Sequence, residues 1–376
     1  MFPTRSGRFL IAALLLALPL HRASALLNFD GTRNQIFVFG SVSLGYNSNV
    51  FSDSTQRGDT NLSGEVGAEY NRLAGALAVN ATGKVGYQTF SKYTSENALN
   101  PNFSIELIKG EGRTTGSFSA KFFRESRSDS SVNLRTNSWN VPLDLKLRYP
   151  FSDRFYGTSE TGYVSRTYSD NNPLLRDYHD YSEALDLFYV YTSKLDLVAG
   201  YRIRYSQVTA GPDTYDHWFN VGAVGSILAK LNGQVRIGYE VRDISGGESF
   251  NHYNALAALN WIVTRKLTVT GQVSRDFNTI ATGASIDSFV AALRANYSFT
   301  RKLEAEGGIA YGRNRFLGGT QSARRDDFFS ADLGARYKIN EHFKVGASYS
   351  YLKNWSTLSF SDFDRQGFSV DISSRF

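Results

Sequence analysis

Apolar and polar residues alternate with a period of two over long stretches of this chain. Between Trp139 and Tyr149 every odd position is apolar or aromatic, and every even position is polar, charged or proline. The same alternation runs from Leu195 to Tyr205, and it returns near the C-terminus. A period of two places successive side chains on opposite faces of a strand. The pattern therefore predicts long β-strands with one apolar and one polar face.

The alternation recurs often enough to predict 18 strands. Short connections, such as residues 192–194, alternate with longer polar ones, such as residues 49–60. Tight turns on one side and longer loops on the other are typical of a transmembrane barrel, and a soluble β-sandwich has no reason to separate them. The expected strands cover residues 35–48, 61–72, 74–90, 102–109, 113–124, 138–149, 154–168, 179–191, 195–207, 217–228, 231–242, 252–263, 266–277, 287–299, 302–314, 327–339, 342–353 and 366–376.

A repeat of two strands supports this interpretation. The residues that open every second strand are spaced by 40, 36, 36, 36 and 40 positions, at Phe155, Leu195, Leu231, Leu267, Leu303 and Phe343. A propeller blade has a similar period, but the chain lacks the signatures of such repeats, and its outer faces would be too apolar. The predicted fold is all-β: a transmembrane, antiparallel, up-and-down β-barrel of about 18 strands, with 16 as the alternative.

Aromatic residues gather at both ends of the predicted apolar faces. One group lies toward the tight turns: Tyr149, Phe155, Tyr189, Tyr191, Trp261, Phe299, Tyr337, Phe343 and Phe376. The other lies toward the longer loops: Tyr163, Tyr205, Tyr253, Tyr311 and Tyr351. Two aromatic girdles around an aliphatic band fit a lipid bilayer, because amphipathic rings favour the headgroup level.

The first 25 residues predict a signal peptide. Two arginines precede an apolar run at residues 9–20, and Ala23-Ser24-Ala25 supplies a cleavage site between small residues. The apolar run is too short for a transmembrane helix. The expected organisation is a signal peptide over residues 1–25 and an outer-membrane β-barrel over residues 26–376.

Composition excludes several classes of protein. The 376 residues include no cysteine, so a disulfide scaffold, a thiolate metal site and a cysteine nucleophile are excluded. Without residues 1–25, which carry three arginines and no acid, the 41 basic residues fall to 38 against 35 acidic ones. Charges this evenly mixed on an exported chain do not indicate nucleic acid as a partner. No zinc spacing or phosphate-binding loop occurs, so we expect neither a metal nor a cofactor.

The predicted mature chain has four histidines, and we consider whether any of them could act in catalysis. His179 and His217 lie beside aspartates near the predicted outer rim, where a His–Asp pair could activate water. His252 lacks a nucleophile-elbow serine, and His342 falls in a predicted turn exposed to solvent. We therefore expect no enzyme, and a hydrolase acting at the rim is kept as an alternative.

The two ends of the predicted barrel have sequence features that resemble those of a known family. The first predicted strand ends in Tyr46-Asn47-Ser48-Asn49-Val50-Phe51, and the last closes on Phe376. Together with the signal peptide, these features resemble the putative β-barrel porin 2 family. The resemblance implies the outer membrane of a Gram-negative bacterium and the barrel assembly machinery as a partner, with Phe376 as the assembly signal. Members of that family often accompany exopolysaccharide export systems. The resemblance therefore also implies components of such a system as partners.

If the apolar face meets lipid and lipopolysaccharide, the polar face lines a lumen. The expected pore-lining residues are Arg202, Arg204, Arg236, Arg242, Arg294, Arg336, Lys338, Glu65, Glu69, Glu106, Asp144 and Asp332. Because the bases lie mostly on later strands and several acids on earlier ones, one hypothesis is a field across the lumen that orients polar solutes. The alternative is that these groups are solvated or paired with one another. Residues 125–137 and 313–327 are the candidates for a loop folded into the lumen.

These observations predict a porin-like outer-membrane channel. It would pass polar solutes by diffusion or serve as the outer-membrane exit for a secreted polysaccharide. Besides the rim hydrolase, the remaining alternative is a structural or adhesive barrel whose lumen is plugged by loops.

Overall fold

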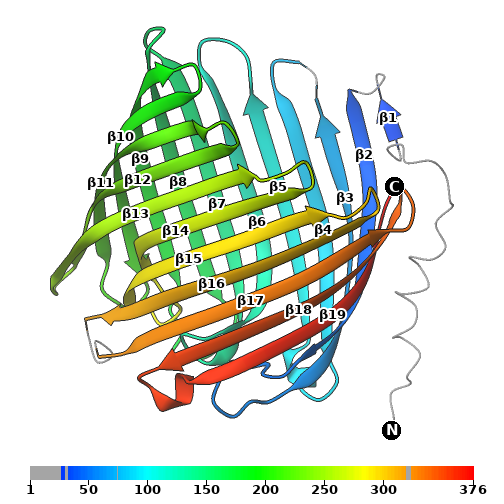
Figure 1. The fold of residues 1–376 in the computed structure, drawn as a ribbon. Helices are drawn as coiled ribbons and strands as arrows, with labels where there is room; N and C mark the ends of the chain where they lie inside the picture. The colour runs from blue at the N-terminus through cyan, green and yellow to red at the C-terminus, as the bar shows by residue number, and fades with distance from the viewer. Residues whose placement is uncertain (1–26, 30–32, 74, 319–322) are drawn as a thin grey trace.

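The chain forms one antiparallel sheet that closes into a barrel (Figure 1). This computed structural model describes residues 27–29, 33–73, 75–318 and 323–376. The barrel strands are β2 (Asn34–Asn47), β3 (Asp59–Arg72), β4 (Ala78–Phe90), β5 (Ala98–Lys109), β6 (Thr115–Asp129), β7 (Leu134–Pro150), β8 (Phe155–Tyr168), β9 (Tyr178–Thr192), β10 (Leu195–Val208), β11 (Thr214–Leu228), β12 (Leu231–Ile244), β13 (Ser249–Ile262), β14 (Leu267–Thr279), β15 (Ser285–Ser298), β16 (Leu303–Leu317), β17 (Arg325–Lys338), β18 (Phe343–Ser356) and β19 (Phe363–Arg375).

The sheet closes where the last strand pairs with β2. The register runs from Gly367 opposite Asn47 to Arg375 opposite Phe39. A short strand, β1 (Leu27–Phe29), pairs with β2 next to the end of β19. Closure satisfies backbone groups that an open sheet edge would leave unpaired.

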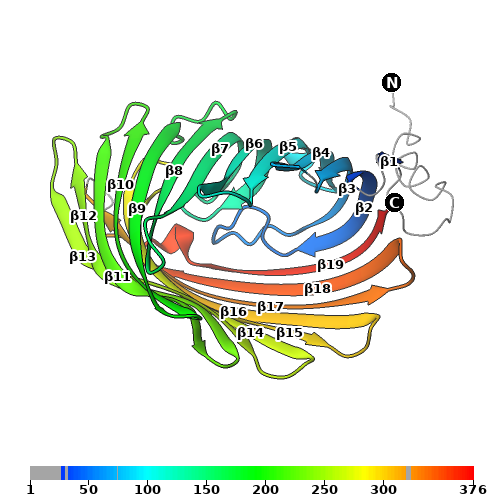
Figure 2. The same ribbon diagram turned by 90° about the horizontal axis from the view of Figure 1, so that it is seen from above.

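Successive residues of each strand face outward and inward in turn, as the period of two requires. On β12, Val235, Ile237 and Tyr239 are exposed on the outside, whereas Glu240 and Arg242 are fully buried within. Viewed from above, the strands form a ring (Figure 2). The outer apolar residues and the inner polar residues therefore follow directly from the sequence pattern.

The two ends of the barrel differ in their connections. One end, called the turn end here, carries tight connections such as residues 193–194 and 229–230, together with the last residues of β19. The other, called the loop end, carries residues 48–58, 91–97 and 169–177. Two short 3₁₀ helices, η2 (Thr94–Glu96) and η4 (Ser359–Ser361), also lie at the loop end. Within the described ranges no helix is long and apolar enough to cross a membrane.

The predicted fold is confirmed, with 18 strands rather than the alternative of 16. Most strands run further toward the loop end than expected. For example, β6 continues to Asp129 and β7 begins at Leu134, where polar residues still pair through their backbones. Alternation of hydropathy does not mark where such a polar strand ends. The predicted signal peptide, residues 1–25, lies outside the described residues.

Candidate functional site in the barrel lumen

Inward side chains are open to solvent toward the turn end of the barrel. Lys146 and Glu160 form a 2.7 Å ion pair, yet their side chains stay 55% and 50% exposed. Arg294 and Asp332, 2.9 Å apart, are 47% and 40% exposed. Nearby, β15–β19 enclose a cavity of about 470 Å³ bounded in part by Asn296, Glu304, Arg336, Ser348 and Asp371. Charged groups this exposed inside a closed sheet indicate a water-filled lumen.

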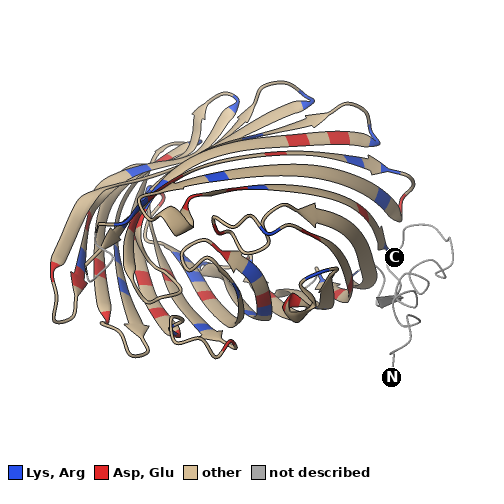
Figure 3. Cartoon of the chain, turned by 90° about the horizontal axis from the view of Figure 1, so that it is seen from below, with Lys and Arg blue, Asp and Glu red and all other residues tan. Residues whose placement is uncertain are grey.

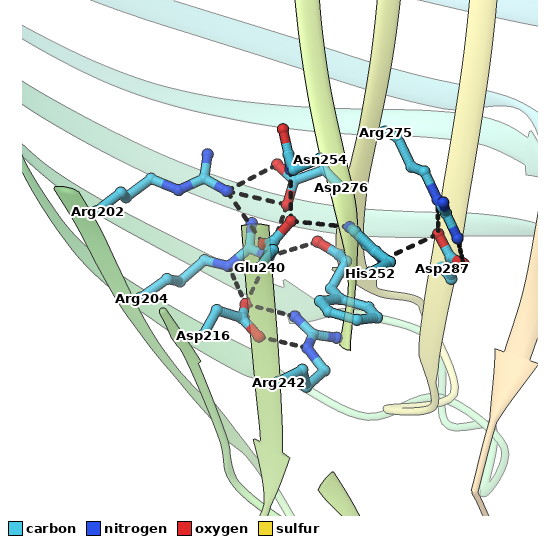
Figure 4. A network of polar contacts seen from close by, with 11 residues as sticks. Arg202, Arg204, Asp216, Glu240, Arg242, His252, Asn254, Arg275, Asp276 and Asp287 are labelled. Atoms are coloured by element: carbon cyan, nitrogen blue, oxygen red, sulfur yellow. Dashed lines mark hydrogen bonds and ion pairs between the residues drawn. The ribbon is translucent and has the colours of Figure 1, made fainter. Parts of the chain in front are cut away.

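Toward the loop end the inner wall is crowded by eight polar residues, the charged cluster (Figure 4). They lie on β10 to β14 and are Arg202, Arg204, Asp216, Glu240, Arg242, His252, Asn254 and Asp276. The outward pair Arg275–Asp287 adjoins the cluster, because Asp287 reaches the Nδ1 atom of His252.

Asp216 holds two arginines at the base of the charged cluster. Arg242 donates to it through Nε and Nη2, at 2.6 and 2.7 Å, in a bidentate pair. Arg204 donates Nε to the same carboxylate at 2.7 Å. Arg242 and Asp216 are almost completely buried. Bidentate, charge-assisted contacts of this kind are among the strongest hydrogen bonds in proteins.

Contacts across the interior join strands that are far apart in the sheet. Arg202 of β10 donates Nη2 to both carboxylate oxygens of Asp276 on β14, at 2.9 and 3.0 Å. Arg236 of β12 similarly reaches Asp186 of β9 at 2.9 Å. These ion pairs connect strands that are not neighbours, and their side chains occupy that side of the lumen.

The sheet is split between β13 and β14 at the loop end. Their register runs only from Ala255 opposite Arg275 to Ile262 opposite Thr268. His252 lies beside this split, buried, with its Nε2 atom 3.1 Å from Glu240 and its Nδ1 atom 3.3 Å from Asp287. The ring of Phe277 packs on His252 with 4.1 Å between centroids.

A second crowded region is the loop after β2, residues 48–58, called the inward loop. It lies inside the ring of strands (Figure 2). Asn49 fixes its shape by donating Nδ2 to the carbonyl oxygens of Asp53, at 2.7 Å, and Asp364, at 3.3 Å. Asn49, Val50 and Asp53 are fully buried. The stretch that carries the family resemblance thus begins the segment that turns into the lumen.

Other loops hold the inward loop in place. Asn133, in the turn between β6 and β7, donates to the carbonyl of Ser52 and accepts from Ser361. Arg365 of β19 donates to the Ser52 hydroxyl at 2.9 Å. Arg324 joins the same β6–β7 turn by donating to the carbonyl of Ser131 at 2.9 Å. The loop is therefore tied to both neighbouring sides of the barrel.

Asp53 is the acid that stabilises the turn within the inward loop. Its carboxylate accepts from the hydroxyl and backbone N–H of Thr55 and from Arg57. Burial raises the pKa of Asp53, but the hydrogen bonds from Thr55 and Arg57 outweigh burial and hold the pKa below its usual range. Asp53 is thus ionised while the loop is folded.

The structure places the predicted pore-lining residues on the inner face but in separate groups. Arg202, Arg204 and Arg242 meet in the charged cluster, and Arg236 pairs with Asp186 beside it. The others lie elsewhere on the wall, in the pairs Glu65–Lys84, Glu69–Arg375, Glu106–Asn80, Asp144–Ser119 and Arg294–Asp332. Arg336 borders the 470 Å³ cavity, and Lys338 borders another of about 580 Å³.

Bases and acids are interleaved around the lumen rather than separated across it (Figure 3). The acidic partners of the arginines on β10 to β15 lie on these same or nearby strands. The separation expected from strand order was wrong because the sequence hypothesis left out acids such as Asp216 and Asp276. The acids and bases of this wall therefore pair locally, and the proposed field across the lumen stays a hypothesis.

Both candidate constriction loops need correction. Most of residues 125–137 belongs to the β6–β7 hairpin, whose turn is residues 130–133. Of residues 313–327, the ends belong to β16 and β17, and residues 319–322 lie outside the described part of the chain. Among the described residues, we assign the inward fold to the inward loop, which the sequence predicted only as a long connection. Its asparagines, which readily bond the backbone of turns, were the available signal.

The histidines do not form the rim dyads of the hydrolase alternative. His179 and His217 point outward from β9 and β11 and bond the hydroxyls of Tyr163, at 3.0 Å, and Tyr201, at 2.8 Å. His342 is buried rather than solvated, because its ring stacks on Phe376 with 4.7 Å between centroids. Among the described residues, no group of three or more His, Cys, Asp or Glu could hold a metal ion.

A closed barrel of 18 strands, apolar outside and polar within, with a loop folded into its lumen, defines a porin-like β-barrel. Residues 213–376 match the model of the family described as putative beta-barrel porin 2, which confirms the predicted resemblance.

Solved outer-membrane proteins share the fold at low sequence identity. OpdQ of Pseudomonas aeruginosa is 8% identical, with a TM-score of 0.51 over 91% of this chain and 97% of that chain. OpdK of the same organism, solved with vanillate, is 11% identical, with a TM-score of 0.50 over 91% and 99% of the two chains. No curated protein sequence matches the chain.

Proposed function

We propose that this protein is an outer-membrane channel that passes small polar solutes by diffusion. The observation that carries the proposal is a change in solvent exposure along the lumen. Inward charges are open to water at the turn end, as at Lys146 and Arg294, and buried at the loop end, as at Arg242 and Asp53. Such a lumen is wide at one end and constricted at the other, as in a selective pore.

The constriction lies between the charged cluster and the inward loop. By strand order, β10 to β12 stand across the ring from β2 and β19, from which the inward loop is held. A solute that passes this level meets guanidinium and carboxylate groups on one wall and backbone and amide groups on the other. Uncharged polar molecules and small ions of either sign fit such a mixed lining.

Small solutes are favoured over a secreted polysaccharide because the inward loop is tied to its surroundings. Asn49, Asn133 and Arg365 connect it to β19 and to the β6–β7 turn. A polymer chain would need this segment to leave the lumen. Export of a polysaccharide therefore requires a second arrangement of the loop.

A liposome swelling assay with sugars of increasing size tests the proposal. Proteoliposomes should swell with monosaccharides and lose the response at the size of short oligosaccharides. In a variant with residues 50–57 replaced by a short Gly-Ser linker, larger sugars should enter. The matched control replaces residues 110–113, a turn at the opposite end, and should keep the wild-type cutoff. Swelling with long oligosaccharides in the wild type would favour the polysaccharide exit, and no swelling at all would contradict a channel.

A further inference from the structure

Four arginines gather on the outer face of the barrel at the loop end, across β14 to β17. They are Arg275, Arg313, Arg315 and Arg325. The cross-strand register sets them in two adjoining rows: Arg275, Phe289 and Arg313 in one, and Arg315 opposite Arg325 in the next. We call this group the outer arginine patch.

The patch lies at the boundary of the apolar outer band. One step toward the barrel centre, Tyr311 stands opposite Ala291 and Phe329, and beyond them come Leu293 and Ile309. Tyrosine and tryptophan of such barrels mark the headgroup level of a bilayer. Arg275 and Arg313 lie one row above Tyr311, and Arg315 and Arg325 lie two rows above it. Their guanidinium groups would therefore lie among lipid headgroups.

Neighbouring acids neutralise only part of the charge of the patch. Arg275 makes a bidentate contact with Asp287, at 3.1 and 2.7 Å. Asp327 is shared by Arg313, at 2.6 Å, and Arg325, at 3.3 Å. Four arginines against these two aspartates leave an excess of two positive charges.

Arg315 is the arginine whose side chain has no partner. It is exposed, and within the described residues its guanidinium group makes no ion pair or hydrogen bond. It borders a hollow of about 340 Å³, with Arg275, Arg313, Asp287, Phe289 and Tyr311 as the other lining residues. An unpaired guanidinium beside a polar hollow is suited to an anion that enters from outside.

The same boundary is built differently on β8 to β11. There the corresponding outward positions form a ladder of tyrosines, in which Tyr163, Tyr181, Tyr205 and Tyr215 stand directly opposite one another. The accumulation of arginine on β14 to β17 is therefore not repeated on β8 to β11.

We propose that the outer arginine patch binds a phosphate group of a phosphorylated glycolipid in the outer leaflet. Planar guanidinium groups bind phosphate oxygens in pairs, and basic pockets at membrane boundaries recognise anionic headgroups. Arg315 and Arg313 would hold the phosphate, and Tyr311 and Phe289 would contact the sugar and upper acyl chain. This inference rests on the proposed outer-membrane location.

Titration of the folded full-length barrel in a neutral detergent tests the inference. The probes are bisphosphorylated lipid A, its dephosphorylated form and inorganic phosphate, with binding followed by native mass spectrometry. We expect lipid A to bind and Arg315→Gln to weaken it by about tenfold, the scale of one charge-assisted contact. Arg315→Lys should bind with intermediate affinity. Arg124→Gln, on the outward face of β6, is the matched control and should bind as the wild type does.

Three outcomes would overturn the inference: no binding of lipid A, equal binding of the dephosphorylated form, or equal losses in the Arg315 and Arg124 variants. Binding of inorganic phosphate as tight as that of lipid A would assign the site to free phosphate instead. Conductance of the same preparations separates this result from the proposed function. A silent barrel that still binds lipid A would contradict only the channel, and a conducting barrel that does not would contradict only the lipid site.

Discussion

At the scale of single residues, burial decides which ion pairs matter to the fold. Arg242 and Asp216 are almost inaccessible to water, whereas Lys146 and Glu160 form an equally short pair that remains half exposed. Removing one partner of a buried pair leaves a charge without compensation in a poor solvent. The same change at an exposed pair returns the remaining charge to water.

Arg242→Ala should therefore lower the free energy of unfolding by about 3–5 kcal/mol. The loss should fall toward the lower end of this range, because Arg204 still pairs with Asp216 in the variant. Lys146→Ala, the matched control, should lower it by less than about 1 kcal/mol. Urea titration of the barrels in liposomes measures both. Equal losses in the two variants would show that the interior of the charged cluster is hydrated.

Asp53 makes the inward loop sensitive to acid. Because its pKa is held below the ordinary value of 3.8, its ionised form stabilises the folded loop at neutral pH, and this stabilisation is lost as pH falls through the folded pKa. We expect channel conductance to stay constant from pH 7 to about pH 4 and to rise below that, as the loop loosens. Asp53→Asn should conduct more at neutral pH and lose the acid response. A wild-type conductance independent of pH down to about pH 2 would contradict this role.

At the scale of strands, alternation with a period of two was enough to locate every barrel strand. It missed β1, which is only three residues long, and it misjudged strand ends where the residues become polar on both faces. It also placed the correct side chains on the inner wall. It could not show that Arg202 meets Asp276, because that contact depends on the curvature of β10 to β14 rather than on either strand alone.

The outward apolar face can be tested on β15. Leu293 is 54% exposed in the middle of the outer band, and Ala292 beside it points inward. Leu293→Arg should lower the free energy of unfolding in a bilayer by about 2–4 kcal/mol, because it places a charge in hydrocarbon. Ala292→Arg should cost much less, because its charge enters the aqueous lumen. Urea titration in liposomes would contradict the assigned faces if the order were reversed.

The terminal strand closes the barrel through Phe376, whose backbone exchanges two hydrogen bonds with Val38 at 3.0 and 2.9 Å. We propose, from the family resemblance, that this residue is also read by the barrel assembly machinery. Deletion of Phe376 should then strongly reduce insertion in cells, while unaided refolding into micelles still yields a folded barrel. Heat-modifiable migration on gels measures both, and equal losses in the two settings would point to a structural role alone.

At the scale of the whole molecule, we propose a closed barrel whose lumen narrows toward one end. The wide part follows from the number of strands, because a barrel of 18 strands is too large for side chains to fill. We place the narrow part between two features on different sides of the lumen, the charged cluster and the inward loop. Neither could be predicted from periodicity, since both depend on contacts between segments distant in the sequence.

Single-channel conductance of the refolded mature protein in a planar bilayer tests whether the lumen is an open aqueous channel. We expect discrete, stable openings, with a larger unitary conductance when residues 50–57 are replaced by a short linker and an unchanged one when residues 110–113 are replaced. A barrel that is folded by heat-modifiable migration but remains silent, with and without the inward loop, would contradict an aqueous lumen.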